Sequence, residues 1–558
     1  MQKLILFFIL LISTFSAFSQ KQKFTYQDTL RGSVTKERAW WNLLHYDLQV
    51  TVDAKNKYIS GVNTIRYEVL KNYQIMQIDL QNPMQIIKIT QNEKELSYKQ
   101  KGNAYFIDLD KIQKVDNKNE ITISFRGKPK EAINPPWDGG FIWKRVQNNI
   151  DSISTKGQNI ILENNFIANA IQSIGASVWW PCKDNPYDEP DNGVSIKVTP
   201  PKGLMDVSNG RLKDVSQNPN GTKTYHWNVI NPINSYSINV NIANYSHFSE
   251  IYQGEKGALD CNYYVLPQNL EKAKMQFQQV AKMLKAFEYW FGPYPFYEDS
   301  YKLVETPYLG MEHQSSITYG NGYKNGYLGN DLSGTGWGLK FDFIIIHESG
   351  HEWFANNITN KDVADMWIHE SFTTYSEVIY LDYHFGTQAG NEYLIGYREK
   401  VKNDKPIIGQ YKVNNHGSND MYIKGAAMIH TLRQIINDDK KFRTILRGLN
   451  QEFYHQTVTS HQVENYISEQ TGIDLNLFFD QYLRTIKIPI IEYKIKKDKI
   501  KYRFKNTVKN FKIPVKVTID GNDIWITPNK RWQTIRNTDK DSSFIIDKNF
   551  YIKNQKVN

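Results

Sequence analysis

Two kinds of hydrophobic pattern divide the chain. From about residue 40 to 250, short runs of alternating or β-branched residues, such as 46–52, are separated by Gly, Asn and Pro. This arrangement is typical of antiparallel strands joined by turns. Helical spacing begins at 270–291 and dominates to about residue 484, and strand-like alternation returns after Pro489. The pattern therefore predicts a β region, a mainly helical region and a second, smaller β region.

This order of elements predicts a multidomain α+β protein. The 558 residues suffice for about three domains, because a domain typically holds roughly 100–200 residues. We expect a signal peptide at 1–19, an N-terminal antiparallel β domain at 20–250, a mainly helical domain at 251–485 and a small β domain at 486–558.

The start of the chain has the pattern of a secretory signal peptide. A short basic start at Met1 to Lys3 precedes the apolar run 4–12, and 17–19 form a small-x-small end. A membrane anchor is the alternative, but the apolar run is shorter than the ~20 residues that span a bilayer. We therefore expect cleavage before Gln20, export to the periplasm or the medium, and no transmembrane span after that cleavage.

Composition excludes several classes of protein. Hydrophobic residues make up 40% of the chain and charged residues 23%, and the mean hydropathy is −0.57. These values exclude a disordered chain and a polytopic membrane protein. Cys182 and Cys261 are the only cysteines. Export would permit a disulfide between them, but the sequence alone leaves their pairing open.

The net charge of +10 resides in the last β region. From Ile488 onward, 17 Lys and Arg stand against 7 Asp and Glu, so the remainder of the chain is close to neutral. This distribution argues against a nucleic-acid enzyme with a basic active cleft, and we expect no nucleic-acid partner. The basic region is either a solvated face or a weak contact for anionic surfaces.

The strongest chemical motif is His347-Glu348-Ser349-Gly350-His351. It follows the apolar run 343–346 and precedes Trp353 and Phe354, so we expect it on a buried helix. Residues at i and i+4 share one helix face, and both imidazoles can therefore reach one ion. Zn²⁺ favours such neutral nitrogen ligands with an open position for water. Glu348 stands where it can take a proton from that water.

A third ligand is predicted eighteen residues beyond His351. Glu370 lies in 366–375, a second amphipathic run that can fold back against the first helix. Its carboxylate would complete a His₂Glu set, which is the ligand set of a hydrolytic zinc. The alternative is three unrelated residues on helix surfaces, and the agreement of motif, spacing and apolar flanks argues against it.

These motifs resemble those of the gluzincin zinc aminopeptidase family, which includes aminopeptidase N and leukotriene hydrolase. In that family, H-E-x-x-H, eighteen residues and a Glu form the zinc site. Three further runs are similar to family motifs: 309–313 to Gly-Ala-Met-Glu-Asn, 422–426 to Tyr-x-Lys-Gly-Ala, and 179–184 to Trp-Phe-Pro-Cys-x-Asp. The resemblance implies a secreted, bacterial-type zinc aminopeptidase with a thermolysin-like catalytic domain and a small C-terminal β-sandwich domain.

The resemblance also implies roles for individual residues and one Zn²⁺ per chain. Glu312, with its motif neighbours Gly310 and Met311, would bind the free α-amine of a peptide substrate, helped by Gln172. An acceptor-only carboxylate suits a cation that must be held at a fixed distance from the zinc. Tyr422 would donate a hydrogen bond to the developing oxyanion. Without the resemblance, we would interpret Tyr422 as a core tyrosine whose hydroxyl has a hydrogen-bond partner.

Some features depart from the family pattern. His313 and His369 stand where the family has Asn, beside the amine motif and the third ligand. Larger relatives continue into a helical domain that closes the cleft, so we expect a more open site here. Two rival functions remain: hydrolysis of a small non-peptide substrate such as an epoxide, and an inactive binding or scaffold protein. The preferred first residue and the oligomeric state stay open.

Overall fold

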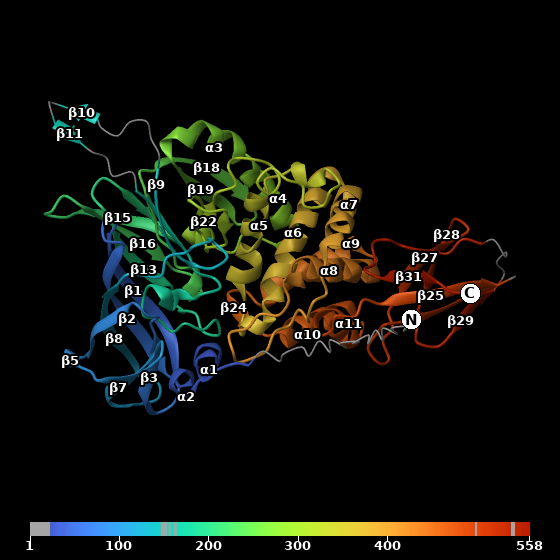
Figure 1. Ribbon diagram of the computed structural model, residues 1–558, viewed down its shortest axis with the longest axis horizontal. Coiled ribbons are helices and arrows are strands. Elements are labelled where there is room, and N and C mark those ends of the chain that lie inside the picture. The colour runs from blue at the N-terminus through green and yellow to red at the C-terminus, as the bar shows by residue number, and fades with distance from the viewer. Residues whose placement is uncertain (1–22, 147–152, 156–157, 161–164, 497–498, 537–541) are drawn as a thin grey trace, which may run out of the picture.

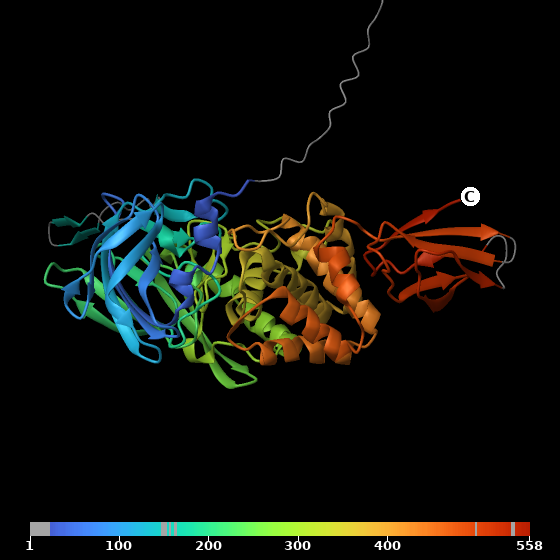
Figure 2. The ribbon, with the colours of Figure 1, turned by 90° about the horizontal axis from the view of Figure 1, so that it is seen from below.

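A computed structural model shows three parts in a row: a β domain, a helical domain and a second β domain (Figures 1 and 2). The structure describes residues 23–146, 153–155, 158–160, 165–496, 499–536 and 542–558. The expected signal peptide at 1–19 lies outside the described residues. Within the described part of the chain, no helix has the length and apolar character needed to cross a membrane.

Among its described residues, the N-terminal domain contains two short α-helices and seventeen strands. In chain order these are α1 (Tyr26–Gly32), α2 (Lys36–Ala39), β1 (Trp41–Asp53), β2 (Tyr58–Val69), β3 (Tyr73–Asp79), β4 (Gln85–Gln91), β5 (Lys94–Glu95), β6 (Tyr98–Lys101), β7 (Ala104–Gln113), β8 (Lys118–Gly127), β9 (Gly140–Arg145), β10 (Ile153–Thr155), β11 (Gln158–Ile160), β12 (Asn165–Ala170), β13 (Val194–Thr199), β14 (Met205–Val207), β15 (Arg211–Gln217), β16 (Lys223–Val229) and β17 (Asn241–Ala243).

The main sheet of this domain has eight strands in the order β15-β16-β13-β1-β2-β8-β4-β5. Its pairs are antiparallel except β1 with β13, which run parallel. The alternation predicted from the sequence is visible in β8, where Ile121, Ile123 and Phe125 are buried and the residues between them are not. A second sheet has the order β14-β17-β12-β9, and the turn that follows β12 lies on the side of the helical domain.

The helical domain begins with a mixed sheet in the order β18-β19-β20-β22-β21. The strands of this domain are β18 (Ser246–Gly254), β19 (Gly257–Val265), β20 (Tyr301–Glu305), β21 (Gly310–Met311), β22 (Ile317–Tyr319), β23 (Ile358–Asn360) and β24 (Gln456–Val458). The last two pair with each other and lie outside the mixed sheet. The boundary expected after residue 250 falls inside β18. Because β18 pairs with β19 along its whole length, β18 belongs to the sheet of the helical domain. The change from one domain's sheet to the other's therefore lies between β17 and β18.

Nine helices complete the domain within the described residues: α3 (Leu270–Gln276), α4 (Gln279–Phe291), α5 (Phe343–Gly350), α6 (Trp367–Phe385), α7 (Thr387–Tyr397), α8 (Ile423–Ile436), α9 (Asp439–Glu452), α10 (Ser460–Thr471) and α11 (Asn476–Leu483). Helix α6 is the central one, because every residue from Trp367 to Leu381 is buried. It packs beside α5, so the two runs that carry the predicted ligands lie together as expected.

The last domain is a small sandwich of two sheets, β29-β26-β25-β31 and β28-β27-β30. Its strands are β25 (Ile490–Lys496), β26 (Lys499–Lys505), β27 (Val515–Ile519), β28 (Asn522–Ile526), β29 (Gln533–Arg536), β30 (Ile545–Ile546) and β31 (Lys553–Lys556). The sandwich lies at the far end of the molecule from the N-terminal domain (Figure 1). Cys182 and Cys261 are both buried and free, so they do not form a disulfide.

Candidate active site

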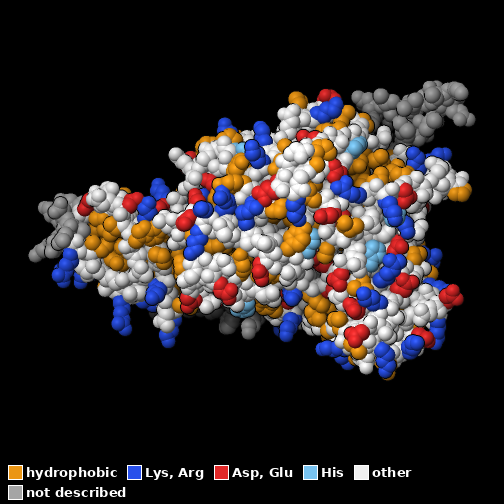
Figure 3. Space-filling model, turned by 180° about the vertical axis from the view of Figure 1, so that it is seen from behind, with side chains coloured by type: hydrophobic (Ala, Val, Ile, Leu, Met, Phe, Trp, Pro, Cys, Tyr) orange, Lys and Arg blue, Asp and Glu red, His pale blue; other side chains and the backbone are white. Residues whose placement is uncertain are grey.

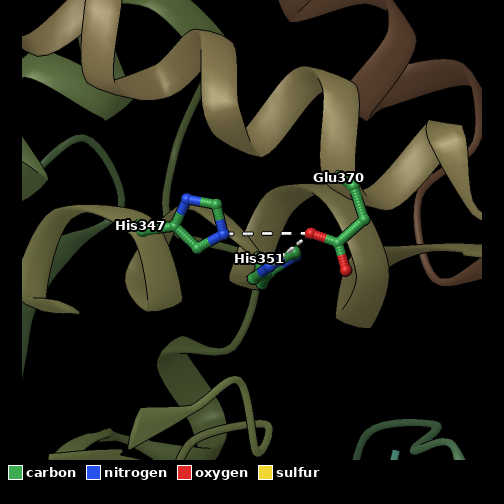
Figure 4. A group of neighbouring side chains, drawn as sticks. All are labelled: His347, His351 and Glu370. Carbon is green, nitrogen blue, oxygen red and sulfur yellow. Dashed lines mark ion pairs between the residues drawn. The ribbon is translucent and has the colours of Figure 1, made fainter. Parts of the chain in front are cut away.

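The three predicted ligands converge in the buried interior of the helical domain (Figure 4). His347 lies on α5, His351 follows the last residue of that helix, and Glu370 lies in the first turn of α6. Glu370 Oε2 is 3.5 Å from His351 Nε2 and 3.8 Å from His347 Nε2. One donor atom of each residue lies within 4.8 Å of the others. The helix pattern and the eighteen-residue spacing therefore bring together the set that they predicted.

The chemistry of these donors fits a zinc ion. Glu370 Oε2 is fully buried and has no hydrogen-bond partner among the described residues, although it faces two imidazole nitrogens. A buried carboxylate oxygen left in this state is costly unless a cation satisfies it. Two neutral nitrogens and one carboxylate form a common set at catalytic zinc, with a fourth position left for water or substrate.

Each histidine is oriented by a contact to its other ring nitrogen. His347 Nδ1 lies 2.7 Å from Glu377 Oε1, and the second oxygen of Glu377 accepts a hydrogen bond from the Tyr393 hydroxyl at 2.6 Å. His351 Nδ1 lies 3.0 Å from both the Phe354 carbonyl oxygen and the Thr373 hydroxyl. Such contacts place the proton on Nδ1 and leave Nε2 free to bind a metal.

The motif lies on a buried helix, as the sequence predicts. This helix, α5, ends at Gly350, and a kinked segment follows at Glu352–Asn357. Ala355 has a φ of 152°, and this kink turns the Phe354 carbonyl back toward His351. Gly350 also permits close packing, since a Cβ there would lie 2.6 Å from Ser376 Oγ on α6.

The residues assigned to the free amine form a second cluster beside the ligands. Glu312 follows the edge strand β21, and Gln172 lies in the turn after β12 of the other domain. Gln172 Nε2 donates to Glu312 Oε1 at 2.5 Å and to Glu370 Oε1 at 3.4 Å. The Tyr236 hydroxyl donates to Glu312 Oε1 at 3.3 Å. Burial raises the pKa of the Glu312 carboxyl, so this group gains from a nearby cation.

The two proposed catalytic groups border the same space. Carboxylate oxygens of Glu348 and Glu312 and a ring nitrogen of His351 lie within 4.8 Å of one another, and burial raises the pKa of Glu348. Tyr422 immediately precedes α8, and its ring stacks on His347 with centroids 6.1 Å apart. Burial, with the charge of Glu370, raises the pKa of the Tyr422 hydroxyl, which keeps it protonated and able to donate.

One cavity of about 630 Å³ joins these groups. All nine residues predicted from the sequence line it, namely Gln172, Gly310, Met311, Glu312, His347, Glu348, His351, Glu370 and Tyr422. One wall is apolar and aromatic, formed by Leu309, Tyr327, Leu332, Phe343 and Tyr397. Another is polar, formed by Ser173, Asn414, Asn415, His416 and Asn419. The cavity therefore suits a substrate with an apolar part and a polar, charged end.

The two histidines that depart from the family pattern are not among the residues that line this cavity. His313 is fully buried, has no hydrogen-bond partner among the described residues and has its pKa lowered to about 3 by burial. His369 Nε2 accepts the Asn360 backbone N–H at 2.9 Å. Two other residues that contact the site, Glu377 and Tyr236, were not predicted from the sequence. Glu377 lies seven residues after Glu370 on the same helix face, a spacing that could have indicated it.

Both domains that line the cavity match models of known protein families. The family model described as the Peptidase family M1 domain matches residues 275–482, and the Peptidase M1 N-terminal domain matches residues 42–237. The chain is 21% identical over 504 residues to the probable aminopeptidase 2 of Sulfurisphaera tokodaii, covering 86% of this chain and 59% of that protein. It is 23% identical over 482 residues to aminopeptidase N of Lactobacillus helveticus, covering 81% and 52%.

The chain thus spans only about half to three fifths of the length of these curated relatives. The fold of the chain is also similar to that of a solved structure. The M1 zinc metallopeptidase from Deinococcus radiodurans matches with a TM-score of 0.64 at 18% identity, covering 81% of this chain and 95% of that one. The two matched family domains are the two that together enclose the cavity. The chain belongs to the M1 family of peptidases.

Proposed function

We propose that this protein is a zinc-dependent aminopeptidase that removes N-terminal residues from peptides. The observation that carries the proposal is the position of Glu312, a buried carboxylate held by Gln172 and Tyr236 directly beside the His₂Glu set. An endopeptidase has no need of a buried anion at this position. A free α-amine beside the scissile bond would satisfy it with charge-assisted hydrogen bonds.

Zinc held by His347, His351 and Glu370 would supply Lewis acidity, which acidifies water and polarises a carbonyl oxygen. Glu348 takes a proton from the attacking water and passes it to the leaving amine, because its carboxylate borders the same space. The Tyr422 hydroxyl donates to the carbonyl oxygen as negative charge develops on it. This bond strengthens toward the transition state and therefore accelerates the reaction.

The proposal is tested with aminoacyl arylamides, each assayed with a free and an N-acetylated amine, before and after chelation. We expect cleavage of the free substrates only, loss of activity with the chelator and recovery when zinc is restored. Glu348→Gln should keep its zinc and lose turnover, whereas Glu312→Ala should mainly raise KM for the free amine. Equal cleavage of blocked and free substrates would indicate an endopeptidase instead.

Three further properties belong to the same proposal. We propose one zinc per chain, supported by the single His₂Glu set that the cavity contains. Export to the periplasm or the medium is supported by the pattern of residues 1–19. The C-terminal sandwich, on which Lys and Arg side chains protrude in Figure 3, is proposed as a weak contact for anionic surfaces. Its excess of positive charge supports that contact, which salt would weaken.

A further inference from the structure

The short helix α1 lies at the junction of the N-terminal and helical domains (Figures 1 and 2). It is far in sequence from the active site, yet it touches two segments that line the cavity. We infer that Arg31 and Gly32, at the end of α1, are positioning residues for the amine end of the cavity, by which we mean the part formed by Gln172, Ser173 and Glu312. This inference rests on the proposed aminopeptidase function.

The end of α1 is held firmly in place. Arg38 is fully buried, and its Nη1 donates to the carbonyl oxygens of Leu30, Arg31 and Ser33 at 2.9, 3.0 and 2.9 Å. Its Nη2 forms an ion pair with Asp79 in the core of the β domain. These bonds satisfy carbonyl groups at the C-terminal end of the helix. The positive charge of Arg38 also interacts favourably with the negative end of the helix dipole. The last turn of α1 is therefore a fixed support.

Arg31 connects this support to the amine end. Its Nη2 donates to the Ser173 carbonyl oxygen at 3.2 Å, and Ser173 follows Gln172 directly in the chain. Asn185 Nδ2 in turn donates to the Arg31 carbonyl at 3.1 Å. Because Gln172 bonds to Glu312, a displacement of the Ser173 backbone moves the amide that orients the amine-binding carboxylate. Arg31 does not line the cavity itself, so it acts on the substrate through Gln172 and Ser173.

Gly32 connects the same support to a second segment that lines the cavity. A Cβ at Gly32 would lie 1.9 Å from the Asn414 nitrogen and 2.5 Å from the Val413 carbonyl carbon, so two backbones meet there. Asn414 lines the cavity, and its φ of 27° is unusual for a residue other than glycine. The neighbouring Lys412 N–H donates to Asp362 at 2.8 Å, which holds the loop from its other side.

Segments of both domains therefore border the amine end, because Gln172 and Asn414 also line one smaller hollow together, and α1 contacts both segments. Gly32 is not in the left-handed region, so alanine suits its own backbone, and the three atoms nearest to the added methyl group all belong to the 413–414 backbone. Backbone atoms cannot move aside as readily as the end of a flexible side chain. Gly32→Ala must separate α1 from this loop, and Arg31→Ala must release the Ser173 carbonyl. Both changes loosen the amine end without touching the metal ligands.

The test compares Arg31→Ala, Arg31→Lys and Gly32→Ala with Gln27→Ala, using a dipeptide with a free amine. Gln27 is a matched control on the same helix, since its side chain bonds to the Lys101 carbonyl, away from the cavity. We expect Arg31→Ala and Gly32→Ala to raise KM roughly tenfold, with kcat changed less than about twofold, because misplaced binding groups weaken binding before chemistry. Arg31→Lys should recover part of the loss, and Gln27→Ala should match the wild type.

Zinc content and melting temperature are measured on every variant to exclude unfolding. The inhibition constant of the released amino acid should rise in parallel with KM, which a loss of general stability would not produce. If KM stays at the wild-type value in both test variants, or if Gln27→Ala shifts it equally, the inference is wrong while the proposed function stands. If the wild type fails to cleave free-amine substrates, the proposed function fails first, and the inference with it.

Discussion

Glu377 should control how tightly the site holds zinc. Its Oε1 lies 2.7 Å from His347 Nδ1, and both groups are buried, so the carboxylate holds the imidazole as the tautomer with Nε2 free. Glu377→Gln keeps the shape and removes the charge. The amide can also turn its NH₂ group toward Nδ1, which would favour the tautomer that cannot bind metal through Nε2.

The expected magnitude follows from the nature of this bond. A hydrogen bond to a charged group contributes about 1.5–3 kcal/mol, against about 0.5–1.5 kcal/mol for a neutral one. The loss of roughly 1–2 kcal/mol corresponds to about 5- to 30-fold weaker zinc binding. This agrees with the 10- to 100-fold typical of changes behind a ligand histidine, so we expect a zinc Kd raised by roughly tenfold or more.

The assay is competition for zinc with a chromophoric chelator at constant pH. Tyr393→Phe is the matched control, because it removes the hydrogen bond to the other oxygen of Glu377 and leaves the contact with His347 in place. We expect the control to weaken zinc binding only a few-fold. If Glu377→Gln binds zinc as tightly as the wild type, while Glu370→Ala loses it, then Glu377 has only a packing role.

Three further changes have defined outcomes. Tyr422→Phe should lower kcat by ~10²–10³ with KM and zinc content nearly unchanged, and a kcat within a few-fold of wild type would exclude Tyr422 as the oxyanion donor. Tyr327→Ala should reduce cleavage of dipeptides with an aromatic second residue by roughly three- to tenfold relative to those with alanine, because Tyr327 packs edge-on to Phe343 in the apolar wall. Lys302→Met should favour folding more at pH 6 than at pH 9, measured by thermal unfolding. Burial lowers the pKa of Lys302 to about 7, so the cost of its buried charge is fully present below pH 7 and falls as pH rises toward the unfolded value of 10.5; an equal effect at both pH values would contradict this account.

Much of the site was predictable because its information is local. His347 and His351 share a helix face through their i, i+4 spacing, and a single amphipathic run carries Glu370 back against them. The order of β, helical and β regions follows similarly from the periodicity of each segment. The kink after α5 was not predicted in this way. It brings the Phe354 carbonyl oxygen to 3.0 Å from His351 Nδ1, a contact that no helical spacing indicates.

The sequence by itself indicated which residues converge on the cavity and the order of the domains, because the spacings and periodicities that carry this information lie within single helices and strands. The tertiary structure decided which distant residues serve that site. Tyr236 reaches Glu312 from the other domain, and α1 reaches Asn414 across about two thirds of the chain. It also separated Cys182 from Cys261, each in the core of its own domain. Contacts of this kind depend on how whole sheets and helices pack, and no periodicity along the chain encodes that packing.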